Sequence, residues 1–141
     1  MTEKINIWKN IDFEDTKDNP LKFLKEQAEL LNSNTNQILE GEVSVTEAFD
    51  KDNNEVVLVY QFYVYAPFLG NFRVNLFNVL QPNKPYPVHI TDLVSKSEKV
   101  TAKDFDEFVK QIEQILKKPD TQNLLKTLYS QSTSNDEKTS R

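Results

Sequence analysis

The sequence contains no cysteine, which excludes disulfide bonds, thiolate metal sites and thiol catalysis. Its only glycines are Gly41 and Gly70, so the chain has no glycine-rich loop that could hold a phosphate and no glycine-flanked turn that could expose a nucleophilic serine. The only histidine is His89. These absences remove the commonest sequence signatures of catalysis, and we expect a protein that is not an enzyme and that has neither a cofactor nor a metal ion.

Long apolar runs are also missing. No stretch approaches the roughly 18 apolar residues of a membrane span, and the polar residues 1–10 lack the apolar centre of a signal peptide. We therefore expect a cytoplasmic protein with no membrane partner. The 22 acidic residues exceed the 17 Lys and Arg residues, and the net charge of -5 disfavours nucleic acid, whose binding depends on neutralising phosphates. A basic protein would be a suitable partner for an acidic chain.

The length of 141 residues, with 28% charged and 38% hydrophobic residues, is typical of one globular domain with a single core. Residues 1–18 alternate loosely between apolar and polar and predict an N-terminal arm or an edge strand. Residues 19–130 carry the periodic apolar patterns of one domain. Residues 131–141 contain no apolar side chain and predict a disordered tail.

The run at residues 55–67 is apolar on both alternating faces and predicts a central β-strand around which the domain is built. Further strands are predicted at 39–49, 72–80 and 86–93, because turn-forming residues separate these apolar patterns. Pro87 indicates that the last of them is an edge strand.

Apolar residues at three- and four-residue steps predict three helices. The first begins at Pro20 after the potential cap Asn19, the second follows the cap-like residues 101–104, and the third covers about 120–129. The fold predicted is α+β: a four-stranded antiparallel meander with one N-terminal and two C-terminal helices on one face, in the order α-β-β-β-β-α-α.

The second face of this sheet is the clearest functional signal. If the helices cover the face that carries Leu58, Phe62 and Leu76, the other face keeps an apolar and aromatic patch with a polar rim, of a kind that monomers seldom expose. The candidate partner-binding residues on it are Val57, Val59, Tyr63, Tyr65, Arg73, Phe77, Val79 and His89. The patch could be covered by the arm or the last helix, by a second copy in a homodimer, or by a different protein.

Other chemistries have weaker support. His89 has no orienting carboxylate that the sequence places beside it. Glu40 and Glu42 share one strand face about 7 Å apart, which suits a carboxylate-based hydrolase, but acidic residues on an edge strand also prevent unwanted strand pairing. We therefore expect a small acidic protein-protein interaction module of a regulatory, chaperone-like or toxin-neutralising kind. The alternative is a small-ligand-binding domain with a pocket between sheet and helices, lined by Tyr60, Phe62 and Phe108.

Overall fold

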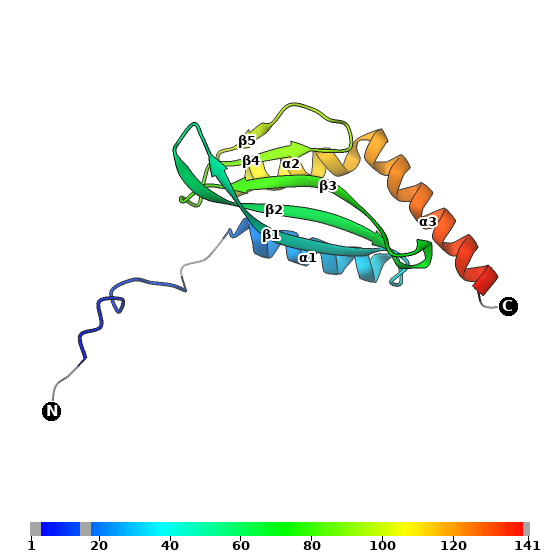
Figure 1. Ribbon diagram of the computed structural model, residues 1–141, viewed down its shortest axis with the longest axis horizontal. Helices are drawn as coiled ribbons and strands as arrows, with labels where there is room; N and C mark the ends of the chain where they lie inside the picture. The colour runs from blue at the N-terminus through cyan, green and yellow to red at the C-terminus, as the bar shows by residue number, and fades with distance from the viewer. Residues whose placement is uncertain (1–3, 15–17, 140–141) are drawn as a thin grey trace.

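The computed structural model describes residues 4–14 and 18–139, together with the side chains of residues 4–14 and 18–135. In chain order the elements are α1 (Pro20–Asn34), β1 (Glu40–Asp50), β2 (Glu55–Ala66), the short 3-10 helix η1 (Pro67–Leu69), β3 (Phe72–Gln81), β4 (Val88–Asp92), β5 (Val100–Ala102), α2 (Phe105–Lys117) and α3 (Pro119–Thr139). Figure 1 views the sheet from the side that carries no helix.

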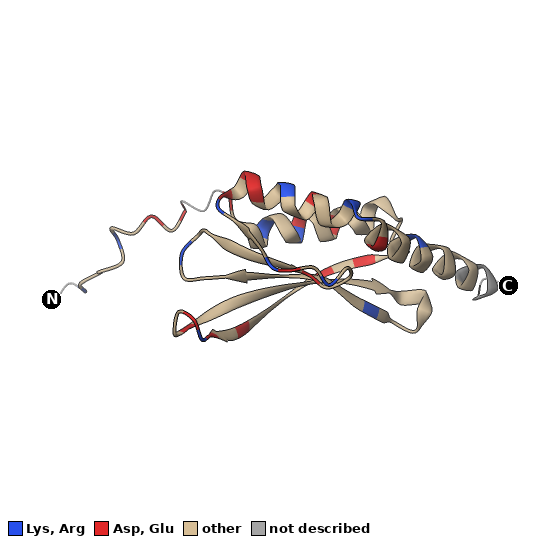
Figure 2. Cartoon of the chain, turned by 90° about the horizontal axis from the view of Figure 1, so that it is seen from above, with Lys and Arg blue, Asp and Glu red and all other residues tan. Residues whose placement is uncertain are grey.

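The sheet is an antiparallel meander in the order β1-β2-β3-β4-β5, so every strand pairs with its neighbours in the sequence. Figure 2 shows the helices gathered on one side of it. The predicted α+β class, the meander and the placement of the helices are therefore confirmed. The one difference is the fifth strand, β5, which has only three residues and is too short for a period of two to be recognised.

The N-terminal caps of α1 and α2 are side chains that bind backbone amides left without partners in the first turn of each helix. The side chain of Asn19 accepts hydrogen bonds from the amides of Leu21 and Lys22, as its position before Pro20 predicts. At α2 the cap is Asp104, which accepts from the amide of Glu107, while the Glu107 carboxylate accepts from the amide of Lys103. This arrangement resembles a capping box, except that the Glu107 carboxylate binds the amide of the residue before the cap and not that of the cap itself. It begins three residues later than the sequence suggested, because Val100–Ala102 is used for β5.

Glycine allows α1 to pack directly on the backbone of β1. A β-carbon added to Gly41 would lie 2.7 Å from the α-carbon of Ala28 and 2.9 Å from its β-carbon. No other residue type fits this contact without moving the helix. In the sheet Gly41 pairs with Val64, and the hairpin that sets this register pairs Asp50 with Glu55.

A β-bulge in β3 changes the assignment of two candidate site residues. Phe62 pairs with Phe77 but Tyr63 pairs with Asn75, which leaves Leu76 as an extra residue. Leu76 and Phe77 are both only 1% exposed. Beyond the bulge the alternation is inverted, so Phe77 and Val79 lie in the core beneath the helices. Their predicted place on the second sheet face is therefore wrong.

The loop between β4 and β5 is fastened to the end of α2 by Asp92, which is 1% exposed. Its carboxylate accepts hydrogen bonds from the amides of Val94 and Ser95 and from the Ser95 hydroxyl, and Lys118 Nζ lies 3.0 Å from Asp92 Oδ2. Lys118 also donates to the hydroxyls of Ser95 and Ser97. Burial by itself would raise the pKa of Asp92, but the hydrogen bonds from Ser95 and Lys118 outweigh it and hold the pKa below its ordinary value.

The last helix is longer than predicted. α3 continues to Thr139, through most of the segment for which a disordered tail was expected, and residues 140–141 lie outside the described part of the chain. The reason is contact with η1: Ser132 is fully buried, and the Asn135 side chain donates a hydrogen bond to the backbone carbonyl of Phe68. Packing of this kind stabilises the C-terminal part of α3, which has no apolar side chain after Tyr129.

The N-terminal segment is an arm and not an edge strand over its described residues. Residues 4–14 form turns, pair with no strand and are all exposed, and Figure 1 shows them leading away from the domain. They do not cover the second sheet face. The other residues of the predicted arm, 1–3 and 15–17, lie outside the described ranges.

Candidate functional site

The sheet face that carries no helix is called the open face below. Strand pairing places side chains on it in rows that run across the sheet, because directly paired residues point to the same side. One row is Thr46, Val59, Leu80, His89 and Thr101; a second is Glu42, Tyr63 and Asn75; a third is Glu40, Tyr65 and Arg73. The open face is therefore continuous from β1 to β5.

Tyr63, Tyr65 and Arg73 form what we call the Tyr–Arg cluster. The Arg73 guanidinium lies 4.4 Å from the centre of the Tyr63 ring and 6.0 Å from that of Tyr65. Arg73 Nη1 also donates a 3.2 Å hydrogen bond to the Tyr65 hydroxyl. Arg73 is exposed and both rings are half-buried. A cation stacked on one ring and hydrogen-bonded to the next is held in position before any partner arrives.

The electrostatics of the cluster keep Arg73 charged. The hydrogen bond to Tyr65 is the largest of the influences that raise the pKa of Arg73, and Tyr65, Tyr63 and Glu42 add electrostatic support. A guanidinium has five N–H groups, and Tyr65 uses one of them. The others can bind a carbonyl or carboxylate oxygen of another molecule.

His89 lies on β4 beside Leu80, in a different row of the open face from the Tyr–Arg cluster. Its Nδ1 is 3.0 Å from the Thr101 hydroxyl. Partial burial lowers the pKa of His89, the charge of Lys99 lowers it further, and Asp50 at the hairpin end opposes both. The half-buried imidazole, held by the Thr101 hydroxyl, adds a polar group to the open face.

The structure thus separates the eight candidate site residues into two groups. Val59, Tyr63, Tyr65, Arg73 and His89 are brought together on the open face, whereas Val57 is buried and Phe77 and Val79 belong to the core. Sequence reasoning missed Leu80 and Thr101, which share a row with His89. The alternation of β3 could not reveal Leu80, because only the bulge turns it to this side.

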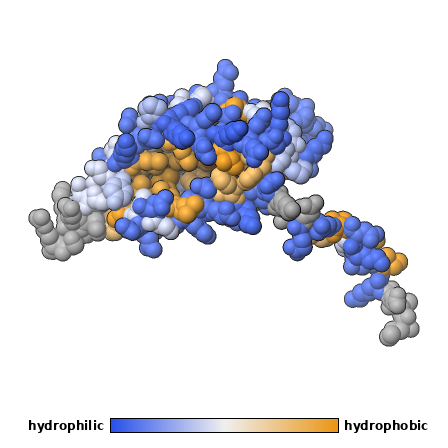
Figure 3. All heavy atoms as spheres, turned by 180° about the vertical axis from the view of Figure 1, so that it is seen from behind, coloured by the Kyte–Doolittle hydropathy of each residue, from blue (hydrophilic) through white to orange (hydrophobic). Residues whose placement is uncertain are grey.

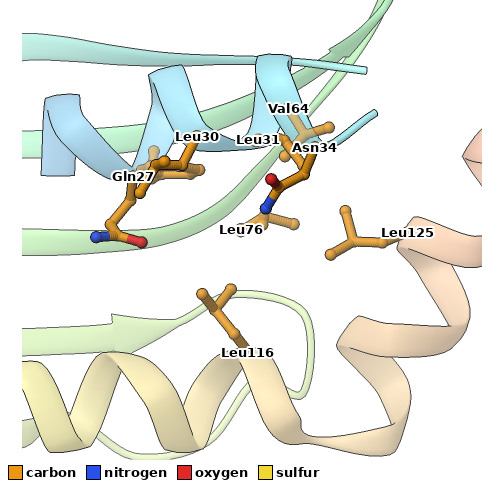
Figure 4. A pocket seen from close by; sticks show the side chains of 9 residues that line it. Gln27, Leu30, Leu31, Asn34, Val64, Leu76, Leu116 and Leu125 are labelled. Carbon is orange, nitrogen blue, oxygen red and sulfur yellow. The ribbon is translucent and has the colours of Figure 1, made fainter. Parts of the chain in front are cut away.

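A second apolar surface lies on the helix side of the sheet. Figure 3 shows it as an apolar hollow, and Figure 4 shows the side chains around it. It holds a cavity of about 190 Å³, and we call it the groove. Its lining consists of Gln27, Leu30, Leu31, Asn34, Phe62, Val64, Leu76, Leu116 and Leu125.

The groove lies over β2 and β3, between α1, which packs mainly on β1, and α2, which packs on β4 and β5. The ring of Phe23 contacts those of Phe105 and Phe108, with centroids 5.7 and 5.8 Å apart, and joins the two helices nearer their N-termini. Of the three residues predicted to line a pocket here, Phe62 does so and Phe108 is used in this contact instead. Tyr60 is buried outside the lining.

The described residues contain no group of three or more His, Asp or Glu that could hold a metal ion. None of the helices, over residues 18–139, is long and apolar enough to cross a membrane. Glu40 and Glu42 are both exposed on the outermost strand, β1. No family model, no curated protein and no solved structure matches this chain, so its function has to be argued from the open face and the groove.

Proposed function

We propose that this protein is a small protein-binding module that binds its partner through the open face. The observation that carries the proposal is the Tyr–Arg cluster: an exposed guanidinium fixed over two tyrosine rings, on a sheet face that no helix covers. Tyrosine and arginine are the residue types that contribute most often to binding energy at protein interfaces.

The cluster supplies what an interface anchor needs. Tyrosine rings present a large contact area and lose little conformational freedom on binding. Arg73 is already oriented by Tyr63 and Tyr65, so a partner need not order it. The row from Val59 to His89 extends the same surface with aliphatic and polar groups, as in the mixed composition of non-obligate interfaces.

The charge of the chain favours a partner of opposite overall charge. A net charge of -5 attracts a basic protein over a distance and raises its rate of association. Within the contact, Glu42 and Glu40 flank the tyrosines and can pair with lysine or arginine, while Arg73 is left for a carbonyl or carboxylate. A regulatory, chaperone-like or toxin-neutralising role in the cytoplasm fits this description.

A non-catalytic role has support from the same side chains. The two carboxylates that a hydrolase would use, Glu40 and Glu42, stand exposed on a strand and not in a cleft. His89 has a threonine as its hydrogen-bond partner, where a general base would need an orienting carboxylate. Surface placement of this kind suits recognition.

Photo-crosslinking tests the proposal. Benzoylphenylalanine in place of Tyr63 should trap a partner from an extract of the source cells, whereas the same group in place of Lys22, on the exposed side of α1, should not. Arg73→Ala in the chain that carries the crosslinker should reduce the yield at least tenfold, since the anchor residues of an interface are worth about 2 kcal/mol or more. The melting temperature should stay the same because Arg73 is exposed. Equal trapping from both positions, or a yield that Arg73→Ala does not change, would contradict the proposal.

A further inference from the structure

Each chain carries two apolar surfaces that have no partner within the described residues. One is the groove between α1, α2 and α3. The other is the N-terminal arm, where Ile5, Ile7, Trp8, Ile11 and Phe13 are between 49% and 90% exposed. Isolated exposed apolar residues are common, but five within nine residues of one segment are not, and such a surface usually marks a site of interaction.

The groove has the size and chemistry of a receptor for one aromatic side chain. An apolar protein cavity of about 150 Å³ is large enough to bind benzene, and this one measures about 190 Å³. Its walls are leucines from three helices over a floor of Phe62, Val64 and Leu76. The carboxamides of Gln27 and Asn34 are its polar groups, and each can accept a hydrogen bond from an N–H.

The arm contains a side chain that matches this receptor. Trp8 is the only tryptophan of the chain and is 61% exposed. Its indole is apolar except for one N–H donor, which needs an acceptor when the ring is buried. The arm is locally shaped around it: the amide of Trp8 binds the Asn6 side chain, and the amide of Ile11 binds the Trp8 carbonyl at 3.0 Å.

We propose that the arm of a second copy of this chain occupies the groove, with Trp8 as the inserted side chain, and that two copies exchange arms in a symmetric dimer. A second copy is favoured over the chain's own arm by the exposure of the arm: residues 4–14 are all exposed, so none of them covers the groove of their own chain. Figures 1 and 3 show the arm leading away from the domain.

Symmetry and area support this occupant. Every chain has one arm and one groove, so two chains satisfy each other completely and the assembly closes as a two-fold dimer. Aromatic side chains bury about 150–250 Å² each, so Trp8 and Phe13 of two arms could bury about 600–1,000 Å². With a similar area of the surface that they cover, the two arms can reach the roughly 1,200–2,000 Å² that a stable interface buries.

Light scattering combined with the fluorescence of Trp8 tests the proposal on the full chain. The protein should have the mass of a dimer, and its single tryptophan should emit at short wavelength and resist a soluble quencher. Leu30→Glu places a charge in the groove at a residue that is 50% exposed, so folding should be preserved. It should give a monomer with solvent-like emission, and Trp8→Ala should also give a monomer. Tyr129→Ala, at an exposed residue of α3 outside the groove, is the matched control and should remain a dimer.

Each other result overturns the proposal and identifies a different arrangement. A monomer whose Trp8 is shielded would mean that the chain's own arm fills the groove. A monomer with exposed Trp8 at all concentrations would leave the groove to a small apolar ligand. A dimer that survives both Leu30→Glu and Trp8→Ala would have to use another surface. The crosslinking at Tyr63 is unaffected by any of these results, because the open face lies on the other side of the sheet.

Discussion

Asp92 is the residue whose protonation we expect to matter most for stability. Its pKa in the folded protein is lowered, whereas in the unfolded chain an aspartate titrates near 3.9. The charged form is therefore favoured by folding, and its contribution is complete above the unfolded pKa and disappears as the pH falls through the folded one. Acid should weaken the attachment of the β4–β5 loop to α2.

Unfolding in urea at a series of pH values measures this contribution. At pH 7, Asp92→Asn should lower the free energy of unfolding by about 1.5–3 kcal/mol, the range for hydrogen bonds to charged groups. The difference between the two proteins should shrink as the pH falls below about 4, because both side chains are then neutral. A difference that stays constant from pH 7 to pH 3 would show that the charge of Asp92 is not the cause.

Substitutions at the two glycines should have different effects on stability. Gly41→Ala should destabilise the fold by about 1–3 kcal/mol, because the new methyl group would overlap the backbone of Ala28. Gly70 has nothing near its missing β-carbon, but its φ of +66° favours residues that accept a left-handed backbone. Gly70→Asn should therefore change stability by less than about 1 kcal/mol, since asparagine adopts this conformation readily. Urea denaturation gives the free energy of unfolding of both variants. Equal losses of stability would contradict the view that close packing against Ala28 requires glycine at position 41.

Among the elements, α3 offers the sharpest test. Because α3 packs against η1, a chain that ends at Ser130 should melt at a lower temperature than the full chain. The shortened chain loses buried Ser132 and the hydrogen bond from Asn135 to Phe68. Ser132→Ala should not have this effect: the hydroxyl is buried without a hydrogen-bond partner, so its removal costs little and can stabilise. Thermal unfolding followed by circular dichroism distinguishes the two. An unchanged melting temperature in the shortened chain would instead support the disordered tail that the composition of residues 131–141 predicts.

The elements also show how far a sequence pattern carries. The caps of α1, the apolar faces of the helices and the order of four strands follow from local residue choice, and these were predictable. The bulge was not, because Phe72 to Leu80 alternates plausibly in either register and only pairing with β2 selects one. That single residue moved Phe77 and Val79 into the core and brought Leu80 to the open face. Packing between distant segments, as between Asn135 and Phe68, leaves no periodic signal at all.

For the whole molecule, the essential arrangement is that the open face and the groove lie on opposite sides of one sheet. The Tyr–Arg cluster was predictable as a group because Tyr63, Tyr65 and Arg73 lie between the bulge and the turn that joins β2 to β3, where the pairing is regular. The groove was predictable only as a pocket of some kind, because the angle between α1 and α2 is not a property of either helix alone. If the groove side of the sheet forms the arm-exchanged dimer, each dimer presents two open faces. A partner with two or more copies of its binding site would then bind with a higher apparent affinity.

The meander has a consequence for how the chain reaches this structure. Each strand pairs only with the strand before and after it, and α1 packs mainly on β1, the next element in the sequence. Few long loops have to close before the sheet forms, so the folding rate should be high for a protein with so much sheet. The contact of α3 with η1 and the hydrogen bond from the Tyr86 hydroxyl to the carbonyl of Asp18, which joins residues 68 positions apart, are long-range exceptions. A transition state built from the β1–β2 and β2–β3 hairpins would leave that bond, and the start of α1, to form late.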